Sequence, residues 1–317
     1  MTDKTLALCI PAFNAAPYLP RLLRSASQQK IPFDEILVFD DCSTDNTSEV
    51  AREFGARVVR GEHNIGCSGG KNRLLKTTNC GWIHFHDSDD DLTPVFTMLA
   101  HKWMAQATAP DVILFDYESR RFDDNQLLAI RHFDPIALRT DPVRYAIRQQ
   151  INPYCGLYRT EALQRVGGYD EDPAVLYNED CRFHMQLAFR GLTFDSEKQV
   201  AVINLERQGS MSDANRAKCA LARLAVLRKA SEAIAPAMRN EVGLEAWLNA
   251  RQLAHVGRFP EMAQAIALAH SMGVRSPVEE RSPIIRQLAA FFPLATFTVR
   301  ARYVNWRRAV GAGAGSA

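Results

Sequence analysis

Residues 83–91 read Ile-His-Phe-His-Asp-Ser-Asp-Asp-Asp, an apolar and aromatic run that ends in a dense group of carboxylates. The apolar part is typical of a buried strand, and the acidic part of a loop at its end. Carboxylates this close repel one another unless a cation or hydrogen-bond donors neutralise them. The stretch therefore predicts either a site for a hard divalent cation or a solvated acidic turn. Asp87 and Asp89, which have one residue between them, are the pair able to bind a single ion.

Strand and helix patterns alternate on both sides of this stretch. The pattern predicts an α/β fold with a mostly parallel, Rossmann-like sheet flanked by helices. In such a sheet, ligands bind beyond the carboxyl ends of the strands. Residues 118–125 are polar and are expected to form an exposed loop or edge. The expected strands are 5–10, 35–39, 57–59, 82–85, 111–117 and 154–159, and the expected helices begin near residues 17, 44, 71, 95, 160 and 178.

Loops that follow the predicted strands carry polar side chains to one edge of the sheet. Neither a GxGxxG nor a Walker A sequence follows the first strand, so dinucleotide and P-loop interpretations lack their motifs. The loops supply instead an acceptor for a base or ribose (Asp41), a cation for phosphate (Lys71) and the carboxylates Asp87 and Asp89. These groups suit a nucleoside diphosphate with its metal ion. The four loops are 11–14, 40–45, 64–72 and 87–91.

Charge divides the 317 residues unevenly. Residues 1–215 contain 23 Lys and Arg against 30 Asp and Glu, whereas residues 216–317 contain 15 against 6. We expect an α/β domain over the first range and an all-helical, basic region over the second. The basic region predicts contact with something anionic, while nucleic acid is not an expected partner.

Cysteine usage and the first residues indicate the compartment. The seven cysteines are scattered and form no CxxC pair, which favours reduced thiols over disulfides or a zinc site. Residues 1–4 run directly into the first strand without a basic and hydrophobic leader, and no apolar run reaches membrane-spanning length. These features predict a cytoplasmic protein.

Four short sequences resemble, in order and spacing, motifs of the family 2 glycosyltransferases of the GT-A fold. They are Ile-Pro-Ala-Phe-Asn at 10–14, Val-Phe-Asp-Asp-Cys-Ser-Thr-Asp-Asn-Thr at 38–47, Asn-Ile-Gly at 64–66 with Lys-Asn at 71–72, and Phe-His-Asp-Ser-Asp-Asp at 85–90. The resemblance extends over residues 5–212. It implies a GT-A fold and transfer of a sugar from a nucleoside-diphosphate donor, usually a UDP-sugar in relatives that are well understood.

The resemblance implies roles in donor binding for residues of these motifs. Asp87 and Asp89 would match the family's DXD element, with Asp89 the direct ligand to Mn²⁺ or Mg²⁺ on the diphosphate. Lys71 would lie near the base or phosphate, and Phe13 would either contact the base or pack against the fold. The implied donor-binding residues are Pro11, Phe13, Asn14, Asp41, Lys71, Asp87, Ser88 and Arg207.

Three other carboxylates of the same loops are interpreted as structural. We expect Asp40 to hold its turn, and Asp90 and Asp91 to cap the segment that follows them.

Glu179 and Asp180 occupy the predicted first turn of a helix. A carboxylate there is held in its ionised form by the helix N-terminus, so it is a competent proton acceptor at neutral pH. Taken alone, the pair is better explained as complementing the helix dipole than as a catalytic site. The resemblance implies that Asp180 is the catalytic base, with Glu179 as a neighbour that contacts the acceptor.

Residues 207–212 resemble the segment that closes over the diphosphate in this family, where Arg207 would neutralise phosphate charge. Relatives often place a histidine nearby, but this chain has none between His184 and His255. We therefore expect water or phosphate oxygens to complete the shell of the metal.

The C-terminal region is rich in Ala, Leu and Arg and predicts helices over 217–234, 241–256 and 260–272. Residues 284–310 combine arginines with large apolar side chains, contain no carboxylate, and are interrupted by Pro293. That composition suits a helix lying on a membrane surface. A helix packed on the protein's own surface is the alternative.

Together these features predict a metal-dependent, inverting glycosyltransferase in polysaccharide or other glycan synthesis. The acceptor would be a glycan, a lipid-linked molecule or a protein, and the enzyme would lie in the cytoplasm at the inner face of the membrane. Two other classes stay open at this point. A nucleotidyltransferase should carry a Gly-rich basic loop after the first strand, where this chain has Pro11 to Pro17. A non-catalytic nucleotide-sugar-binding scaffold would not need Asp180.

Overall fold

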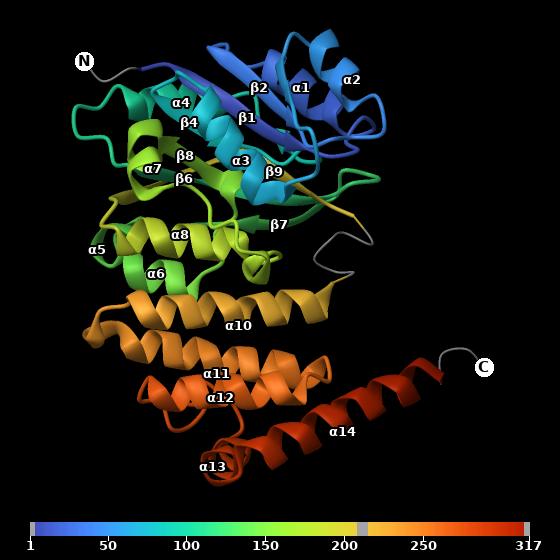
Figure 1. The fold of residues 1–317 in the computed structure, drawn as a ribbon, viewed down its shortest axis with the longest axis vertical. Coiled ribbons are helices and arrows are strands. Elements are labelled where there is room, and N and C mark those ends of the chain that lie inside the picture. The colour runs from blue at the N-terminus through green and yellow to red at the C-terminus, as the bar shows by residue number, and fades with distance from the viewer. Residues whose placement is uncertain (1–3, 208–214, 314–317) are drawn as a thin grey trace. The chain divides into compact units, whose positions relative to one another are not determined.

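The computed structural model describes residues 4–207 and 215–313, without the side chains of residue 305 and residues 308–313. The chain divides into two compact units (Figure 1). The first consists of residues 1–171 with 183–210, and the second of residues 172–182 with 211–317. Nothing in the sequence pattern indicated that residues 172–182 group with the helical unit.

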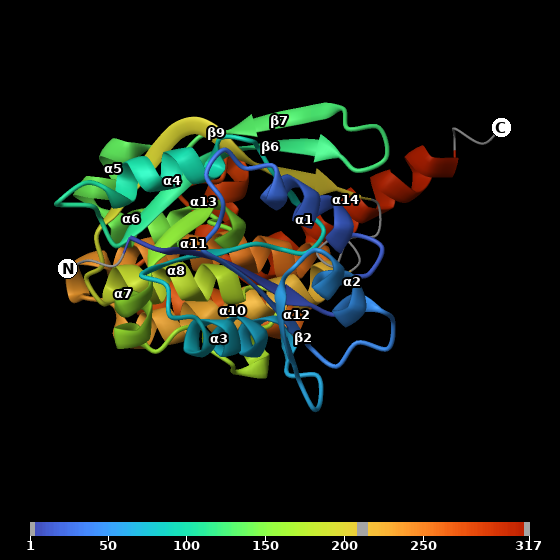
Figure 2. The same ribbon diagram turned by 90° about the horizontal axis from the view of Figure 1, so that it is seen from above.

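Four parallel strands form the first half of the sheet, in the order β3-β2-β1-β4. Every side chain from Leu6 to Ile10 is fully buried. Because successive residues of a strand point to opposite faces, both faces of β1 are covered. Figure 2 shows α1 and α2 on one face and α3 on the other. The four strands are β1 (Leu6–Ala12), β2 (Glu35–Asp40), β3 (Arg57–Arg60) and β4 (Trp82–Phe85).

The second half of the sheet mixes directions. β8 runs antiparallel between β4 and β6, and β9 runs parallel to β6. The expected loop over 118–125 was wrong in part: β6 continues to Arg121, because its polar end is hydrogen-bonded to both β9 and β7. The sequence pattern missed β7 and β9. The strands are β5 (Asp91–Leu92), β6 (Val112–Arg121), β7 (Leu127–Arg131), β8 (Gly156–Arg159) and β9 (Phe194–Glu206).

Helices of the α/β unit follow the predicted alternation, with two differences. α3 begins at Gly66 rather than near Lys71. Residues 135–148, for which no helix was predicted, form two short helices whose N-caps are Asp134 and Asp141. The helices are α1 (Leu19–Ser27), α2 (Thr47–Glu53), α3 (Gly66–Thr77), α4 (Phe96–Met104), α5 (Pro135–Thr140), α6 (Pro142–Arg148), α7 (Thr160–Val166) and α8 (Glu179–Phe189), with a 3₁₀ turn at Pro153–Cys155.

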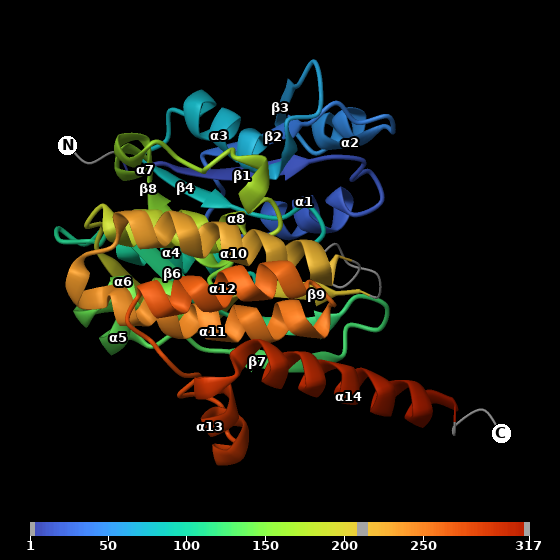
Figure 3. The ribbon, with the colours of Figure 1, turned by 60° about the horizontal axis from the view of Figure 1, so that its bottom comes forward.

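The second unit is helical, as predicted, and the three helices expected up to residue 272 are confirmed. Figure 3 shows α10, α11 and α12 side by side. The predicted break at Pro293 is also observed, because α13 ends just before it and α14 starts there. No helix in the described part of the chain is long and apolar enough to cross a membrane. The helices are α10 (Arg216–Ala233), α11 (Arg239–His255), α12 (Phe259–Ser271), α13 (Pro283–Phe291) and α14 (Pro293–Gly313), with 3₁₀ turns at Pro173–Val175 and Pro236–Met238.

Candidate active site

Asn14 joins the loops that follow β1 and β2. Its backbone lies in the left-handed region, with φ of 49°. Its Oδ1 accepts a hydrogen bond from the backbone N–H of Thr44 (2.8 Å), and its own N–H donates to Ser43 Oγ (2.9 Å). Asn14 therefore fixes the shape of both loops, and the predicted donor contact stays a prediction.

Asp40 holds the turn after β2, as predicted. It is fully buried and accepts hydrogen bonds from the Ser43 N–H (2.8 Å) and the Ser48 hydroxyl, while Arg60 Nη1 lies 3.1 Å away. Burial alone would raise the pKa of Asp40, but these hydrogen bonds and the charge of Arg60 hold it below its ordinary value. Asp40 therefore stays ionised inside the fold.

Asp41 is buried and explains why α3 begins early. Its Oδ1 accepts from the N–H of Ile65 (2.7 Å) and its Oδ2 from the N–H of Gly66 (2.8 Å). These N–H groups lie at the start of α3, where they have no partner within the helix, so the carboxylate takes the place of a cap. Each oxygen can accept a second hydrogen bond, which leaves room for the predicted contact with a base or ribose.

Pro11 and Phe13 differ in their surroundings. A Cβ at Gly70 would lie 3.3 Å from Pro11 Cβ and 3.0 Å from the Phe39 ring. The absence of a side chain at Gly70 therefore allows α3 to pack closely against the ends of β1 and β2. Phe13, in contrast, is 51% exposed and is not part of the core. This exposure favours contact with a base over the alternative of packing against the fold.

Lys71 and Asp87, predicted on separate loops, form an ion pair. The Lys71 side chain is 1% exposed, and its Nζ lies 3.7 Å from Asp87 Oδ1 and 5.1 Å from the centroid of the Tyr169 ring. Asn72 fixes Tyr169, accepting from its backbone N–H (2.8 Å) and donating to its carbonyl oxygen (3.0 Å). The buried cation is thus held between an aromatic ring and the first carboxylate of the acidic stretch.

Asp89 is paired with Arg207, which the sequence placed more than a hundred residues away. Arg207 Nη2 lies 3.0 Å from Asp89 Oδ2, and the guanidinium carbon lies 4.5 Å from the centroid of the Tyr18 ring. Burial, and then the charge of Asp87, raise the pKa of Asp89, while Arg207 opposes the rise. The residues that follow Arg207 in the predicted closing segment, Gln208 to Ser212, lie outside the described residues.

The donor set at this strand end suits a hard divalent cation. Asp87 and Asp89 are partly exposed and close enough for the charge of one to raise the pKa of the other, and Ser88 between them is half-buried. In the described part of the chain, no group of three or more His, Cys, Asp or Glu side chains is arranged to hold an ion. Asp87 and Asp89 are the residues that would hold Mg²⁺ or Mn²⁺ here, and completion of the shell by water or phosphate oxygens stays a prediction.

Asp90 and Asp91 do not cap the following helix, which corrects that expectation. The N-cap residue of α4 is Val95, whose side chain makes no capping hydrogen bond, and the N–H of Thr97 in the first turn donates to Gln29 Oε1 (3.1 Å). Asp90 is 4% exposed and accepts from the N–H of Leu205 in β9 (2.7 Å), and Asp91 pairs with Arg21 Nε (3.1 Å). Burial, and then the charge of Asp87, raise the pKa of Asp90 well above its usual value. Both residues tie the acidic stretch to the rest of the α/β unit.

Glu179 and Asp180 open α8, within the stretch that groups with the helical unit. Glu179 is 6% exposed and Asp180 is half-buried. The first helical hydrogen bond runs from the N–H of Arg182 to the carbonyl oxygen of Asn178 (3.1 Å). Both carboxylates thus lie in the first turn of α8. Their roles as base and neighbour stay predictions.

A buried histidine pair immediately before Asp87 was missed by the sequence analysis. His84 Nδ1 lies 2.8 Å from the Gly156 carbonyl oxygen, and His84 Nε2 lies 3.0 Å from His86 Nδ1. Burial lowers the pKa of His84 well below its usual value and that of His86 to about 3. Because a carbonyl oxygen can only accept, His84 carries its proton on Nδ1, and His86 Nδ1 donates to His84 Nε2.

Comparison with known proteins gives the class to which this site belongs. The profile of glycosyl transferase family 2 matches residues 7–167, half of the chain. The chain belongs to this family, which decides against the nucleotidyltransferase class. It is 26% identical over 140 residues to a putative teichuronic acid biosynthesis glycosyltransferase of Bacillus subtilis, TuaG, and 32% identical over 90 residues to an uncharacterized glycosyltransferase of Haemophilus influenzae. These matches cover 38% and 28% of this chain, and only 56% and 31% of the two relatives.

Solved structures support the GT-A architecture. Residues 1–349 of Staphylococcus aureus TarS superpose with a TM-score of 0.66 at 16% identity, covering 95% of this chain and 91% of that one. The mannosyltransferase PcManGT of Pyrobaculum calidifontis, solved with GDP-Man and Mn²⁺, has a TM-score of 0.59 at 20% identity, covering 96% and 86%. TarS has also been solved with UDP-GlcNAc, with a TM-score of 0.59 at 18% identity, covering 93% and 81%. The predicted fold class is therefore confirmed.

Proposed function

We propose that this glycosyltransferase moves a sugar from a UDP-sugar to an acceptor hydroxyl with inversion at the anomeric carbon, using Mn²⁺ or Mg²⁺. The observation that carries the proposal is the alternation of charge at the end of β4, where Lys71 pairs with Asp87 and Arg207 with Asp89. Two carboxylates for a cation beside two cations for phosphate are the groups that a metal–diphosphate needs. The structures of TarS with UDP-GlcNAc and PcManGT with GDP-Man and Mn²⁺ support this interpretation.

The residues of the chain divide the work between donor and acceptor. Asp87 and Asp89 would hold the cation, which when bound supplies positive charge to the departing diphosphate. Lys71 and Arg207 add fixed positive charge for the same phosphates. Asp180 removes the proton from the acceptor hydroxyl as its oxygen attacks the anomeric carbon, and Glu179 contacts the acceptor. Phe13, Asp41, Pro11, Asn14 and Ser88 complete the donor site.

We also propose an acceptor and a location. The similarity to a putative teichuronic acid biosynthesis enzyme favours a cell-surface polysaccharide or its lipid-linked precursor as the acceptor, over a protein. We propose that the enzyme acts in the cytoplasm at the inner face of a membrane, as a peripheral membrane protein.

A thermal-shift panel tests the donor site. UDP, GDP, CDP and ADP, each with and without Mn²⁺, are added to the wild type, to Asp89→Ala and to the control Asp195→Ala. Asp195 is a partly buried carboxylate that pairs with Arg139 at 3.1 Å and has no part in the proposed site. We expect UDP with Mn²⁺ to stabilise the wild type and the control but not Asp89→Ala. If no nucleotide raises the melting temperature of the wild type with or without metal, the proposed donor site is wrong.

Transfer assays test the catalytic base and the stereochemistry. Asp180→Asn should abolish transfer and keep the nucleotide-induced thermal shift. Asp172→Asn, a control in the same stretch that loses an ion pair with Lys229, should keep transfer. NMR of the product should show an anomeric configuration opposite to that of the donor. Near-normal transfer by Asp180→Asn would remove that residue from the mechanism, and a chain that binds donor without any transfer or hydrolysis would be a scaffold.

A further inference from the structure

The last two described helices expose large apolar side chains. On α13, Ile284, Leu288 and Phe291 are 69%, 50% and 78% exposed. On α14, Val299 and Trp306 are 67% and 61% exposed. Tyr303 lies between them and is 55% exposed. We call these six residues the outer face.

Spacing shows that the outer face is one stripe on each helix. Both sets follow the pattern i, i+4, i+7, so their members lie above one another along one side of a helix. The opposite side is buried: Ala289 of α13 is 0% exposed, and Phe297 and Ala301 of α14 are each 2% exposed. The predicted alternative, a helix packed on the protein's own surface, is therefore observed for this inner side of α14, whereas the stripe stays exposed.

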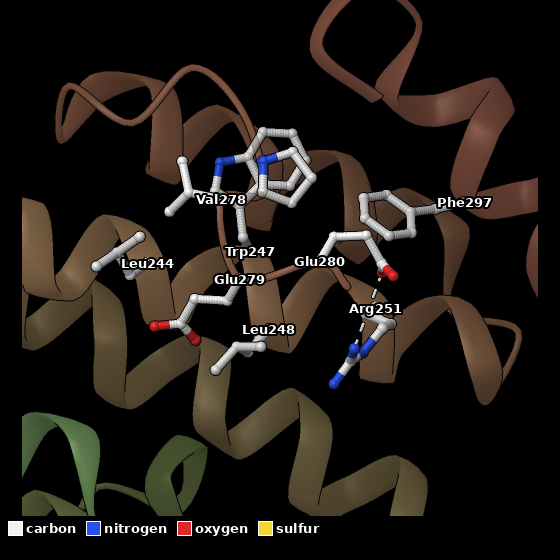
Figure 4. A pocket seen from close by; sticks show the side chains of 9 residues that line it. Leu244, Trp247, Leu248, Arg251, Val278, Glu279, Glu280 and Phe297 are labelled. Atoms are coloured by element: carbon white, nitrogen blue, oxygen red, sulfur yellow. Dashed lines mark ion pairs between the residues drawn. The ribbon is translucent and has the colours of Figure 1, made fainter. Parts of the chain in front are cut away.

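Packing within the helical unit fixes which side of α14 faces outward. The Phe297 ring lies 5.9 Å from the Trp247 ring of α11, and both border a small pocket together with Arg251 and Glu280 (Figure 4). Glu280 is 6% exposed and pairs with Arg251 (3.9 Å) and with Arg300 of α14. This ion-pair cluster and the Phe297 contact hold α14 by its inner side, so the stripe cannot turn inward without breaking them.

Charge around the outer face has one sign. After Glu280 the chain contains six arginines and no Asp or Glu: Arg281, Arg286, Arg300, Arg302, Arg307 and Arg308. Arg302 and Arg307 are exposed, and their positions in the helix lie on either side of the stripe formed by Val299, Tyr303 and Trp306. An exposed apolar stripe bordered by cations, such as that of α14, is uncommon on the surface of a monomer and marks an interaction site.

We propose that the outer face of α13 and α14 docks on a membrane surface containing anionic phospholipid. Apolar side chains would enter the headgroup boundary, Trp306 and Tyr303 would lie at the depth that aromatic rings prefer, and the arginines would meet phosphate. A second copy of the chain fits less well, because a twofold contact would set arginines against arginines. This surface accounts for the peripheral location proposed above and does not depend on which sugar is transferred.

Vesicle binding by the full chain tests the proposal directly. Sedimentation is measured with phosphatidylcholine vesicles, with and without phosphatidylglycerol, at low and high salt. We expect binding only to the anionic vesicles, and an affinity that falls by about fivefold for each arginine that is screened by salt or substituted. Trp306 is the most exposed of the four tryptophans, so its emission should shift to shorter wavelength on binding.

Paired variants locate the surface. Phe291→Ser with Trp306→Ser should abolish binding, whereas Leu128→Ser with Ile130→Ser, at exposed apolar positions of β7, should not. Arg302→Glu with Arg307→Glu should weaken binding at least about 25-fold, whereas the same charge change at exposed Arg52 and Arg165 should have less effect.

Three outcomes would overturn the proposal. They are absence of wild-type binding to anionic vesicles, equal reduction of binding in test and control variants, and light scattering that shows a dimer dispersed by the Phe291 and Trp306 changes. None of them bears on the nucleotide-induced thermal shift, so the donor site is judged separately.

Discussion

The guanidinium of Arg207 lies 3.0 Å from the carboxylate of Asp89, which is one of the two proposed metal ligands. Without a metal, the arginine is the counter-ion of Asp89. With a metal and a diphosphate in place, the carboxylate would bind the cation and the arginine would be released toward phosphate. We therefore expect the arginine and the proposed metal to compete for this carboxylate.

Arg207→Ala should separate metal binding from transfer. Removal of the competing cation leaves Asp89 uncompensated, so we expect Mn²⁺ to bind several-fold more tightly, by a factor of about 2 to 10. Transfer should fall by about 100-fold, because the phosphates no longer have this cation beside them. Isothermal titration with Mn²⁺ and steady-state kinetics measure the two effects.

Arg120→Ala is a matched control for this change. Arg120 is similarly exposed and also paired with a carboxylate, Glu118, at 2.7 Å. Neither Mn²⁺ affinity nor transfer should change in this variant. If Arg207→Ala lowered Mn²⁺ affinity, competition between the arginine and the metal would be excluded.

Metal affinity should depend on pH through Asp89. Its pKa is raised by burial and by Asp87, and only the ionised form binds a cation. As pH falls, Mn²⁺ affinity should therefore decline at a higher pH than an ordinary aspartate would require. Titrations across a pH series measure the midpoint. Arg207→Ala removes a positive charge that lowers this pKa and should move the midpoint higher; a downward move would contradict the assignment.

We expect the negative charge of Asp90 to destabilise the folded state. The pKa of Asp90 is higher in the folded protein than in the unfolded chain. As pH rises above the pKa of the unfolded chain, keeping Asp90 folded therefore costs increasing free energy. In acid, where the carboxyl is protonated in both states, this cost disappears. Asp90→Asn keeps an acceptor for the Leu205 N–H without the charge. At neutral pH this variant should be as stable as the wild type or more so, and its advantage should shrink in acid.

Asp90→Ala is the control for that hydrogen bond. It leaves the Leu205 N–H without its acceptor and should lower the free energy of unfolding by about 1–3 kcal/mol. Denaturant unfolding of the three proteins at neutral and acid pH measures both effects. An Asp90→Asn variant as unstable as Asp90→Ala would show that the negative charge itself is needed.

Two adjacent glycines offer a test of how Asn72 fixes the site. Gly167 and Gly168 both have positive φ, 88° and 74°. A Cβ at Gly167 meets no atom within 4 Å, whereas one at Gly168 would lie 2.3 Å from Asn72 Oδ1. Gly167→Ala should cost about 1 kcal/mol of backbone strain, and Gly168→Ala clearly more. Gly168→Ala should also weaken nucleotide binding, because Asn72 positions Tyr169 beside Lys71. Equal unfolding free energies would contradict this account.

The local sequence pattern could predict those residues of the site that lie near the ends of strands. Asp41, Asp87 and Asp89 follow buried strands, and Lys71 lies in the first half of the helix after β3, so an α/β pattern brings them to one edge. The pattern failed at β9, whose residues Asp195 to Lys198 interrupt its apolar run with charge. Because β9 was not predicted, the hydrogen bond between Asp90 and Leu205 could not be predicted either. Capping of the following segment was the explanation that the neighbouring residues supported.

Contacts between residues distant in the chain could not be predicted from the sequence, for a different reason. Arg207 was expected to contact phosphate, but its neighbours Asp89 and Tyr18 come from loops distant in the chain, and no periodicity encodes such a pairing. The C-terminal stripe is the opposite case. Its composition was visible in the sequence, but only packing of Phe297 and Ala301 decides which side faces outward.

The fixed proton arrangement of His84 and His86 gives this enzyme a natural spectroscopic label. Each ring is neutral and confined to one tautomer, so its two nitrogens should give well-separated ¹⁵N resonances that do not move across the working pH range. His86 precedes Asp87 directly in the chain. A change in its resonance on addition of nucleotide and cation would therefore report occupancy of the site without any introduced probe.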